Sequence, residues 1–377
     1  MVARAAVALV ALCVSRVGAA GAQVCPADRP HVDAAADSND WEAHFDRGVE
    51  LLRNRHQKSA EAAFLWASRL DPRRAEPLLA RWAAAWARDG GRFAEHLNHD
   101  PRKPEPPEAL RIDSLRDRAL MRNPLAYQSL ILLAYNELPG SWRDNQITRA
   151  WFAYSNLEFE NALSAFGALV AQNPERYRDL RFLRATVYVA MTQVDSATAE
   201  ITKLLEALRR EDTATSSSVY QSKALLEYAL GLLHTARRDF PSARAALERA
   251  VIEDLAFYPA HLALGRLADA QRDSRTALEE FGRAAEIAPT DPVTRYEYGA
   301  ALAQARRGPE AAQELRAAVA LEPCFADSYY WLGEALMQQA DTASALEDFR
   351  TYAAHAARAA PLLGVARQRI ARLGGRP

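Results

Sequence analysis

The sequence shows no marked excess of charge of either sign and no long hydrophobic run. Lys and Arg number 47 against 48 Asp and Glu, which gives the 377-residue chain a formal net charge of -1. Proteins that bind nucleic acid through its phosphates need clustered positive charge, so this balance argues against a nucleic-acid partner. The apolar run from Ala5 to Val14 covers about ten residues, whereas a helix that spans a bilayer needs roughly 20. We therefore expect no transmembrane span.

The sequence also lacks the motifs of common enzyme chemistries: it has no glycine-rich phosphate loop, no GxSxG elbow, no CxxC and no CxxCH. His96 and His99 lie three residues apart beside Glu95 and Asp100, a spacing that one helix face could offer to a metal. This segment has neither the HExxH order nor a third ligand, so a solvated helix end is favoured. For His261 a groove or packing role is favoured over a catalytic one. We expect no enzyme activity, no metal and no cofactor.

The first residues have the pattern of an export signal. Arg4 precedes the apolar run, and Ala20-Gly21-Ala22 follows it as a small-x-small site that resembles a secretory cleavage signal. A buried N-terminal helix is the alternative, but Arg16 and the small-residue tail fit it poorly. We expect residues 1–22 to be a cleavable signal peptide and the protein to be periplasmic or extracellular. Cleavage removes two arginines, which leaves 45 basic against 48 acidic residues and a net charge near -3.

A fixed interval organises the C-terminal half. Gly231, Gly265, Gly299 and Gly333 each lie 34 residues apart, and similar residue types return behind each glycine at the same offsets. This period suits two antiparallel helices of roughly 12 to 15 residues each with their turns. The second copy carries the full set, which is Leu264, Gly265, Ala277, Phe281, Ala284 and Pro289.

These offsets correspond to packing positions. Gly265 and Ala284 are small residues where two helices approach closely, and Leu264 and Phe281 fill the space between helices. Pro289 cannot continue a helix and marks the start of the next repeat. The pattern resembles the tetratricopeptide (TPR) repeat, whose signature is Leu-Gly in the first helix and Ala, Phe, Ala, Pro in the second. The resemblance implies an all-α solenoid, a right-handed superhelix of helix-turn-helix repeats.

Further copies precede the four regular ones, with Gly48, Ala150 and Ala185 at the glycine position. The second helices of these copies carry Phe64, Phe166 and Ile201 at the position of Phe281. We therefore expect about eight repeat units. In the last copy Tyr352 and Ala357 replace the alanine and proline, and the stripe Leu363, Ala366, Ile370 and Leu373 predicts a helix that caps the array.

These patterns divide the chain into segments. The expected segments are a signal peptide at 1–22, a flexible leader at 23–40, one repeat at 41–74, degenerate helical repeats at 75–142 with a proline-rich insertion at 100–107, two repeat-like units at 143–211, a Ser/Thr-rich loop at 212–223, four repeats at 224–359, and a capping helix and tail at 360–377. Within the degenerate segment the helical pattern covers 77–88 and resumes near Ser114 and at 125–137. The insertion is equally consistent with a hinge.

After signal cleavage two cysteines remain, Cys25 and Cys324. An exported protein can keep a disulfide. The two residues lie in an extended leader and in a repeat turn, far apart in an elongated array, so we expect them to be unpaired.

The resemblance also implies a binding groove lined by the first helix of each repeat, in which a peptide or protein segment is held. Tyrosines suit a peptide surface, although they also serve packing at this position. The lysine and asparagine clamp of the chaperone-tail-binding members is absent. The groove positions fall in two rows, which we call the first row (Tyr228, Leu262, Tyr296 and Tyr330) and the second row (Leu232, Arg266, Ala300 and Glu334).

The C-terminal arginines Arg358, Arg367, Arg369, Arg372 and Arg376 follow the last carboxylate. Favourable cations near a helix end account for them at about 0.3 to 1 kcal/mol each, and contact with an anionic envelope surface through Arg367, Arg369 and Arg372 is the alternative. We expect a non-catalytic scaffold that helps to assemble a cell-envelope complex, with specificity from Arg266 and Glu334. The alternative is an accessory subunit of an envelope enzyme that presents a polysaccharide or other substrate chain.

Overall fold

The computed structural model describes residues 25–26, 28–88, 107–126, 149–150, 153–154, 156–210 and 222–374, and every regular element in these ranges is a helix. The expected signal peptide, the proline-rich insertion apart from Pro107, and residues 212–221 of the expected 212–223 loop lie outside them, as do His96 and His99. The helices are α1 (Trp41–Arg53), α2 (Gln57–Leu70), α3 (Glu76–Arg88), α5 (Pro107–Arg122), the 3-10 turn η1 (Pro124–Ala126), α8 (Phe159–Gln172), α9 (Leu180–Ala190), α10 (Val194–Arg210), α11 (Lys223–Ala236), α12 (Phe240–Glu253), α13 (Tyr258–Ala270), α14 (Ser274–Ile287), α15 (Pro292–Gln304), α16 (Gly308–Leu321), α17 (Ala326–Gln338), α18 (Thr342–His355) and α19 (Leu363–Arg372).

One turn geometry recurs between the first and second helix of the repeats. A residue other than glycine with φ between 59° and 63° stands seven residues after each small residue of the repeat pattern. Arg272, for example, follows Gly265, and the N–H of Asp273 donates to the Ala268 carbonyl over 2.9 Å, which closes the helix as in a Schellman motif. The complete set is Arg55, Leu157, Thr192, Arg238, Arg272, Arg306 and Ala340. The same turn therefore follows the small residue of every repeat copy in the set, including Gly48, Ala150 and Ala185.

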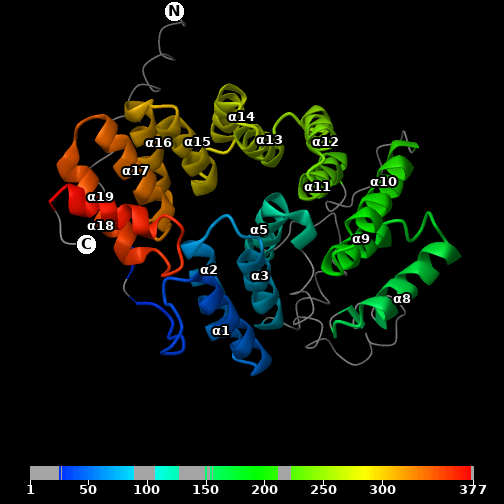
Figure 1. The fold of residues 1–377 in the computed structure, drawn as a ribbon. Coiled ribbons are helices and arrows are strands. Elements are labelled where there is room, and N and C mark those ends of the chain that lie inside the picture. The colour runs from blue at the N-terminus through cyan, green and yellow to red at the C-terminus, as the bar shows by residue number, and fades with distance from the viewer. Residues whose placement is uncertain are drawn as a thin grey trace, which may run out of the picture.

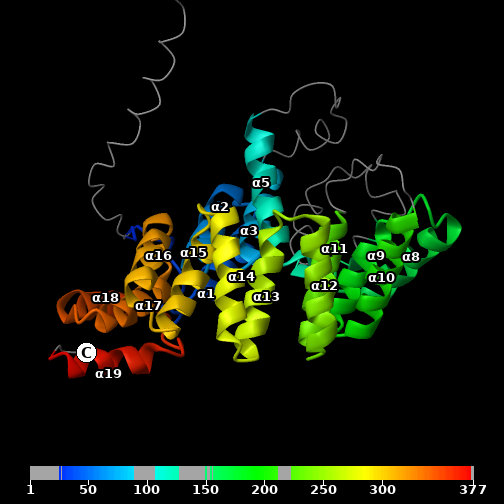
Figure 2. The ribbon, with the colours of Figure 1, turned by 90° about the horizontal axis from the view of Figure 1, so that it is seen from above.

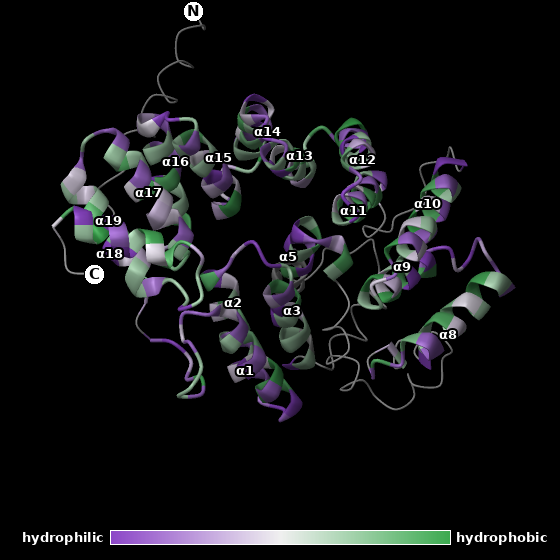
Figure 3. Cartoon of the chain, viewed as in Figure 1, coloured by the Kyte–Doolittle hydropathy of each residue, from purple (hydrophilic) through white to green (hydrophobic). Residues whose placement is uncertain are grey.

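The glycines of the pattern are sites of close helix approach. A Cβ placed on Gly265 would lie 2.6 Å from the Phe281 ring, and one on Gly231 would lie 2.5 Å from the Leu247 side chain. Phe281 and Leu247 are buried. The helices show hydrophobic and hydrophilic positions along the same segment (Figure 3), which is the pattern of elements that bury one face. The expected packing of helix pairs is therefore confirmed.

The repeats curve so that the two ends of the described chain meet. Helices α8 to α19 follow an arc, and α1, α2, α3 and α5 lie on its inner side (Figure 1). In Figure 2, α13 and α14 stand in front of α2 and α3, and α5 extends beyond them. We call residues 25–26, 28–88 and 107–126 the N-terminal block and residues 222–374 the C-terminal array. Helix α5 begins at Pro107, earlier than the expected Ser114, because proline is well tolerated in the first turn of a helix.

The expectation that Cys25 and Cys324 are unpaired was wrong. The two residues form a disulfide, with 2.10 Å between the sulfur atoms and 4.7 Å between the Cα atoms. The prediction failed because it assumed an elongated array, whereas the curvature brings these residues together. The segment that follows Cys25 also contacts the end of the array: Asp37 accepts a hydrogen bond from the Arg358 backbone N–H over 2.5 Å, and the Asn39 side chain donates to the Ala354 carbonyl over 3.0 Å.

Helix α19 covers the C-terminal end of the array, as expected. Leu363, Ala366 and Ile370 are buried, and Leu373 packs against the same cluster. On the other side of α19, Val365 is 39% exposed. The predicted capping stripe is confirmed.

Candidate functional site

The first row of the inner face is buried. Exposed fractions are 2% for Tyr228, 4% for Leu262, 8% for Tyr296 and 6% for Tyr330. Tyr330 packs against Phe349 of its own repeat, with ring centroids 5.8 Å apart. The N-terminal block covers part of this row: the Tyr228 hydroxyl donates to the Arg122 carbonyl over 3.0 Å.

Arg122, at the end of α5, inserts into the C-terminal array at the start of α15. Its Nη2 lies 2.5 Å from Oδ1 of Asp291, and the arginine side chain is only 5% exposed. Tyr258 donates its hydroxyl to the other carboxylate oxygen of Asp291 over 3.0 Å. Burial alone would raise the pKa of Asp291, but the charge of Arg122, together with hydrogen bonds from Arg122, Val293 and Tyr258, outweighs burial and holds that pKa below its usual value. Asp291 is also the N-cap of α15, where it accepts from the Val293 N–H.

Arg73, in the turn after α2, occupies a similar place one repeat further on. Its Nη2 lies 2.9 Å from Oδ2 of Asp327, and its guanidinium carbon lies 5.6 Å from the centre of the Tyr296 ring and 5.1 Å from that of Phe325. Desolvation opposes the charge of Arg73, but Asp71 and Asp327 together hold its pKa above the ordinary value. Burial raises the pKa of Asp327, with Arg73 opposing that shift.

The second row is less completely covered. The Arg266 side chain is 43% exposed and donates through Nε and Nη2 to one oxygen of Glu297, over 2.9 and 2.7 Å. Leu232 is half-buried and Ala300 is buried. Glu334 accepts from Nε of Arg369 over 2.8 Å and is 18% exposed. The second row therefore combines an accessible cation, an apolar position and a carboxylate that α19 already engages.

The C-terminal arginines have different environments. Arg369 pairs with Glu334, and Arg358 lies near Asp37 of the leader. Arg367 and Arg372 are exposed on α19. Arg376 lies outside the described residues. The structure therefore leaves two of the three arginines of the proposed anionic contact facing solvent.

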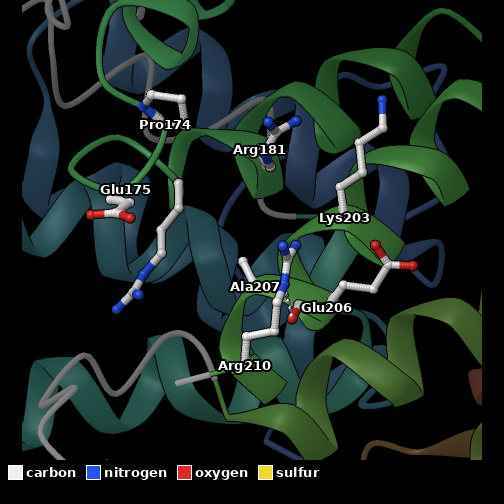
Figure 4. A pocket seen from close by; sticks show the side chains of 8 residues that line it. Pro174, Glu175, Arg181, Lys203, Glu206, Ala207 and Arg210 are labelled. Carbon is white, nitrogen blue, oxygen red and sulfur yellow. Dashed lines mark hydrogen bonds between the residues drawn. The ribbon is translucent and has the colours of Figure 1, made fainter. Parts of the chain in front are cut away.

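A pocket of about 380 Å³ lies between the turn before α9 and helix α10. Its charged lining comes from three arginines, Lys203 and two glutamates, most of them labelled in Figure 4; the arginines are Arg178, Arg181 and Arg210. Arg181 pairs with Glu200 over 3.0 Å, and Arg210 donates to the Glu206 carbonyl over 3.2 Å. Because the lining is mixed in charge and largely exposed, this pocket is a solvated surface hollow.

A second pocket of about 360 Å³ lies where the N-terminal block meets the end of the array. Trp41, Arg74 and Asp327 line it, and the Arg74 guanidinium carbon lies 4.9 Å from the centre of the Trp41 ring. Sequence reasoning missed this seam because its two sides come from opposite ends of the chain.

His261, the histidine for which the sequence favoured a groove or packing role, lies inside one repeat. His261 is buried, with its Nδ1 2.7 Å from Oε2 of Glu280 on the next helix, which is a packing contact within one repeat. Among the residues that the structure describes, no group of three or more His, Cys, Asp or Glu residues could hold a metal ion. Within the same residues no helix is both long and apolar enough to cross a membrane.

No family model matches the sequence, and no curated protein matches it. Solved structures do resemble the fold. YrrB, described as a TPR protein with an unusual peptide-binding site, is 20% identical over 55% of this chain and 99% of its own, with a TM-score of 0.43. MamA is 15% identical over 47% of this chain and 91% of its own, with a TM-score of 0.40. The C-terminal part of a TPR protein from Cytophaga hutchinsonii is 17% identical over 55% of this chain and 78% of its own, with a TM-score of 0.45.

Proposed function

We propose that this chain, a solenoid of TPR-type repeats, is an exported, non-catalytic scaffold that binds a peptide or protein segment along its inner face and serves in the assembly of a cell-envelope complex. The observation that carries the proposal is the second row, where Arg266 stays accessible on α13 between the buried residues Gly265 and Leu267. Because Glu297 holds the guanidinium in place, a bound segment would meet a cation whose side chain is already ordered.

The disulfide supports the export part of the proposal. Disulfides persist in oxidising compartments and are rare in the cytosol. The bond between Cys25 and Cys324 is therefore consistent with the secretory signal expected at residues 1–22. A location in the periplasm or outside the cell satisfies both features.

Tryptophan exposure distinguishes the peptide ligand from a polysaccharide, because sugar-binding grooves offer open aromatic faces. Among the residues described, Trp66 and Trp82 are buried, and Trp41 and Trp331 are half-buried. Tyrosine and leucine prevail on the inner face instead. A peptide or protein segment is therefore the favoured occupant over a substrate chain of an envelope enzyme.

Affinity capture from envelope extracts with crosslinking tests the proposal. The bait is the mature protein, compared with Arg266→Glu on the inner face and with Arg275→Glu as the matched control. Arg275 lies on α14, outside the second row, and its side chain is 90% exposed. Both variants replace an arginine with a glutamate, so they change the net charge equally. We expect Arg266→Glu to lose specific partners and Arg275→Glu to retain them. Equal recovery by all three baits would exclude the second row as the binding surface.

A further inference from the structure

Three arginines of the N-terminal block meet three carboxylates of the C-terminal array. Arg69 lies 3.1 Å from Glu322, and the pairs of Arg73 with Asp327 and Arg122 with Asp291 lie further along the inner face. Each pair joins segments more than one repeat apart in the sequence. The array thus presents acidic side chains at the starts of α15 and α17, and arginines of the block pair with them, with Asp71 of the block also near Asp327.

We propose that the first turns of α15 and α17 form an arginine-binding surface, which the N-terminal block occupies within the chain and which a basic, arginine-bearing segment of a partner protein occupies once the block moves away. This inference rests on the proposed function, because it specifies the chemistry of the partner for the same inner face. The surface comprises Asp291 with Tyr258 and Tyr228, and Asp327 with Tyr296 and Phe325.

The geometry selects guanidinium over ammonium. At the second site a planar cation lies between a carboxylate and two aromatic rings, with its central carbon 5.6 and 5.1 Å from the Tyr296 and Phe325 centroids. Arginine can stack on a ring and donate in its plane at the same time, whereas lysine offers a compact, strongly hydrated charge. At the first site the Tyr258 hydroxyl and the helix N-cap role fix the orientation of Asp291.

The present occupant fits the first site imperfectly. Arg122 is 5% exposed, yet its Nη1 has no hydrogen-bond partner. A buried donor without a partner is unfavourable, because it has given up its hydrogen bonds to water and gained none in return. An arginine delivered by another chain, with freedom to satisfy that nitrogen, can therefore compete with it.

The contact between block and array is also of a kind that can exchange. Beside apolar contacts such as that of Leu120 with the cluster around Tyr228, it includes three ion pairs. A buried ion pair contributes little net stability, because desolvation offsets its attraction. The disulfide raises the effective concentration of the block at the array without adding contacts at the two arginine sites. Removing that bond should make the arginine sites accessible to a competitor.

The test measures binding of a fluorescein-labelled peptide of alternating arginine and serine by fluorescence anisotropy, at an ionic strength of about 0.15 M. A matched peptide with lysine in place of arginine is the control probe. The mature wild-type chain is compared with an unlatched variant (Cys25→Ser with Cys324→Ser) and with a vacated variant that adds Arg73→Gln and Arg122→Gln. We expect the vacated variant to bind the arginine peptide about tenfold more tightly than wild type does. We expect the same variant to bind the lysine peptide more weakly than it binds the arginine peptide.

Two substitutions locate the gain. Asp291→Asn with Asp327→Asn in the vacated variant should abolish it, and asparagine preserves the N-cap of α15. The matched control is Asp273→Asn, because Asp273 caps α14 and lies outside the arginine sites. Equal affinity for the two peptides, or a gain that survives loss of both aspartates, would overturn the inference.

Circular dichroism checks that each variant is folded. Should the vacated variant lose its helical signal, the unlatched variant replaces it. The unlatched chain must then bind the arginine peptide more tightly than wild type, and equal binding by the two overturns the inference. If Arg266-dependent partners are captured while the arginine peptide fails to bind, the scaffold proposal stands and only the inference about arginine is lost.

Discussion

Each regular repeat depends on a residue small enough for a bulky side chain of the following helix to pack against its backbone. At Gly265 the Phe281 ring occupies the space that a Cβ would need, at 2.6 Å. At Gly364, in α19, nothing lies within 4 Å of the same added atom. The same substitution at these two positions therefore meets opposite physical conditions.

We predict that Gly265→Ala lowers the free energy of unfolding by about 1 to 2 kcal/mol, because overpacking outweighs the better helix propensity of alanine. Gly364→Ala should raise it by roughly 0.5 to 1 kcal/mol, since only propensity changes there. Urea unfolding followed by circular dichroism measures both. A stabilised Gly265→Ala variant would mean that the Phe281 ring can move aside at little cost. In the copy at Ala150 an alanine already shares a buried cluster with Phe166.

Residue types indicated these small positions, but they gave no sign of the turns that follow them. Arg238, Arg272 and Arg306 adopt positive φ, where glycine or asparagine would be the expected signal. The recurring helix closure, with hydrogen bonds such as Arg307 N–H to the Leu302 carbonyl at 2.9 Å, imposes that conformation. The 34-residue spacing therefore predicted the positions of the turns but not their backbone conformation.

At the scale of helices, the repeat pattern predicted the regular pairs and the capping helix, and it was least informative for α5. The register is lost between α3 and α8, so no pattern indicated that α5 would lie inside the arc. Besides its packing against α3, it contacts distant residues: Leu120 packs with Tyr228, and Arg122 meets Asp291. Such long-range contacts leave no periodic trace in a single sequence.

Helix α19 gives an element-scale prediction. Ile370 is 1% exposed and packs on the last repeat, whereas Val365 is 39% exposed on the same helix. Ile370→Ala should cost about 2 to 5 kcal/mol locally and speed amide hydrogen exchange in α17 and α18 while leaving α9 unchanged, because repeats contact mainly their neighbours. Val365→Ala should leave exchange nearly as in wild type. Uniform acceleration in every repeat would show that α19 acts on the whole array instead of its end.

At the scale of the molecule, the sequence predicted a solenoid but not its closure. The curvature accumulates over many repeats, and small rotations at each one decide whether the ends meet. The first-row tyrosines illustrate the consequence: their positions matched a groove, but Tyr228 and Tyr296 contact the chain's own Arg122 and Arg73. The repeat pattern identifies which residues face the inner side of the arc. It does not indicate that the N-terminal block occupies that side.

The Cys25–Cys324 disulfide closes a loop with a sequence separation of 299 residues, and this makes the closure testable. Such a bond stabilises mainly by restricting the unfolded chain, typically by about 2 to 4 kcal/mol. We predict that Cys25→Ser with Cys324→Ser lowers the melting temperature of the oxidised protein, and that a dithiol reductant lowers wild type to the same value without affecting the double variant. Peptide mapping without reduction should recover the two cysteines in one linked fragment. Free thiols at both positions in protein purified from an oxidising compartment would contradict the closed arrangement, because in that arrangement the two residues are adjacent and oxidation should join them.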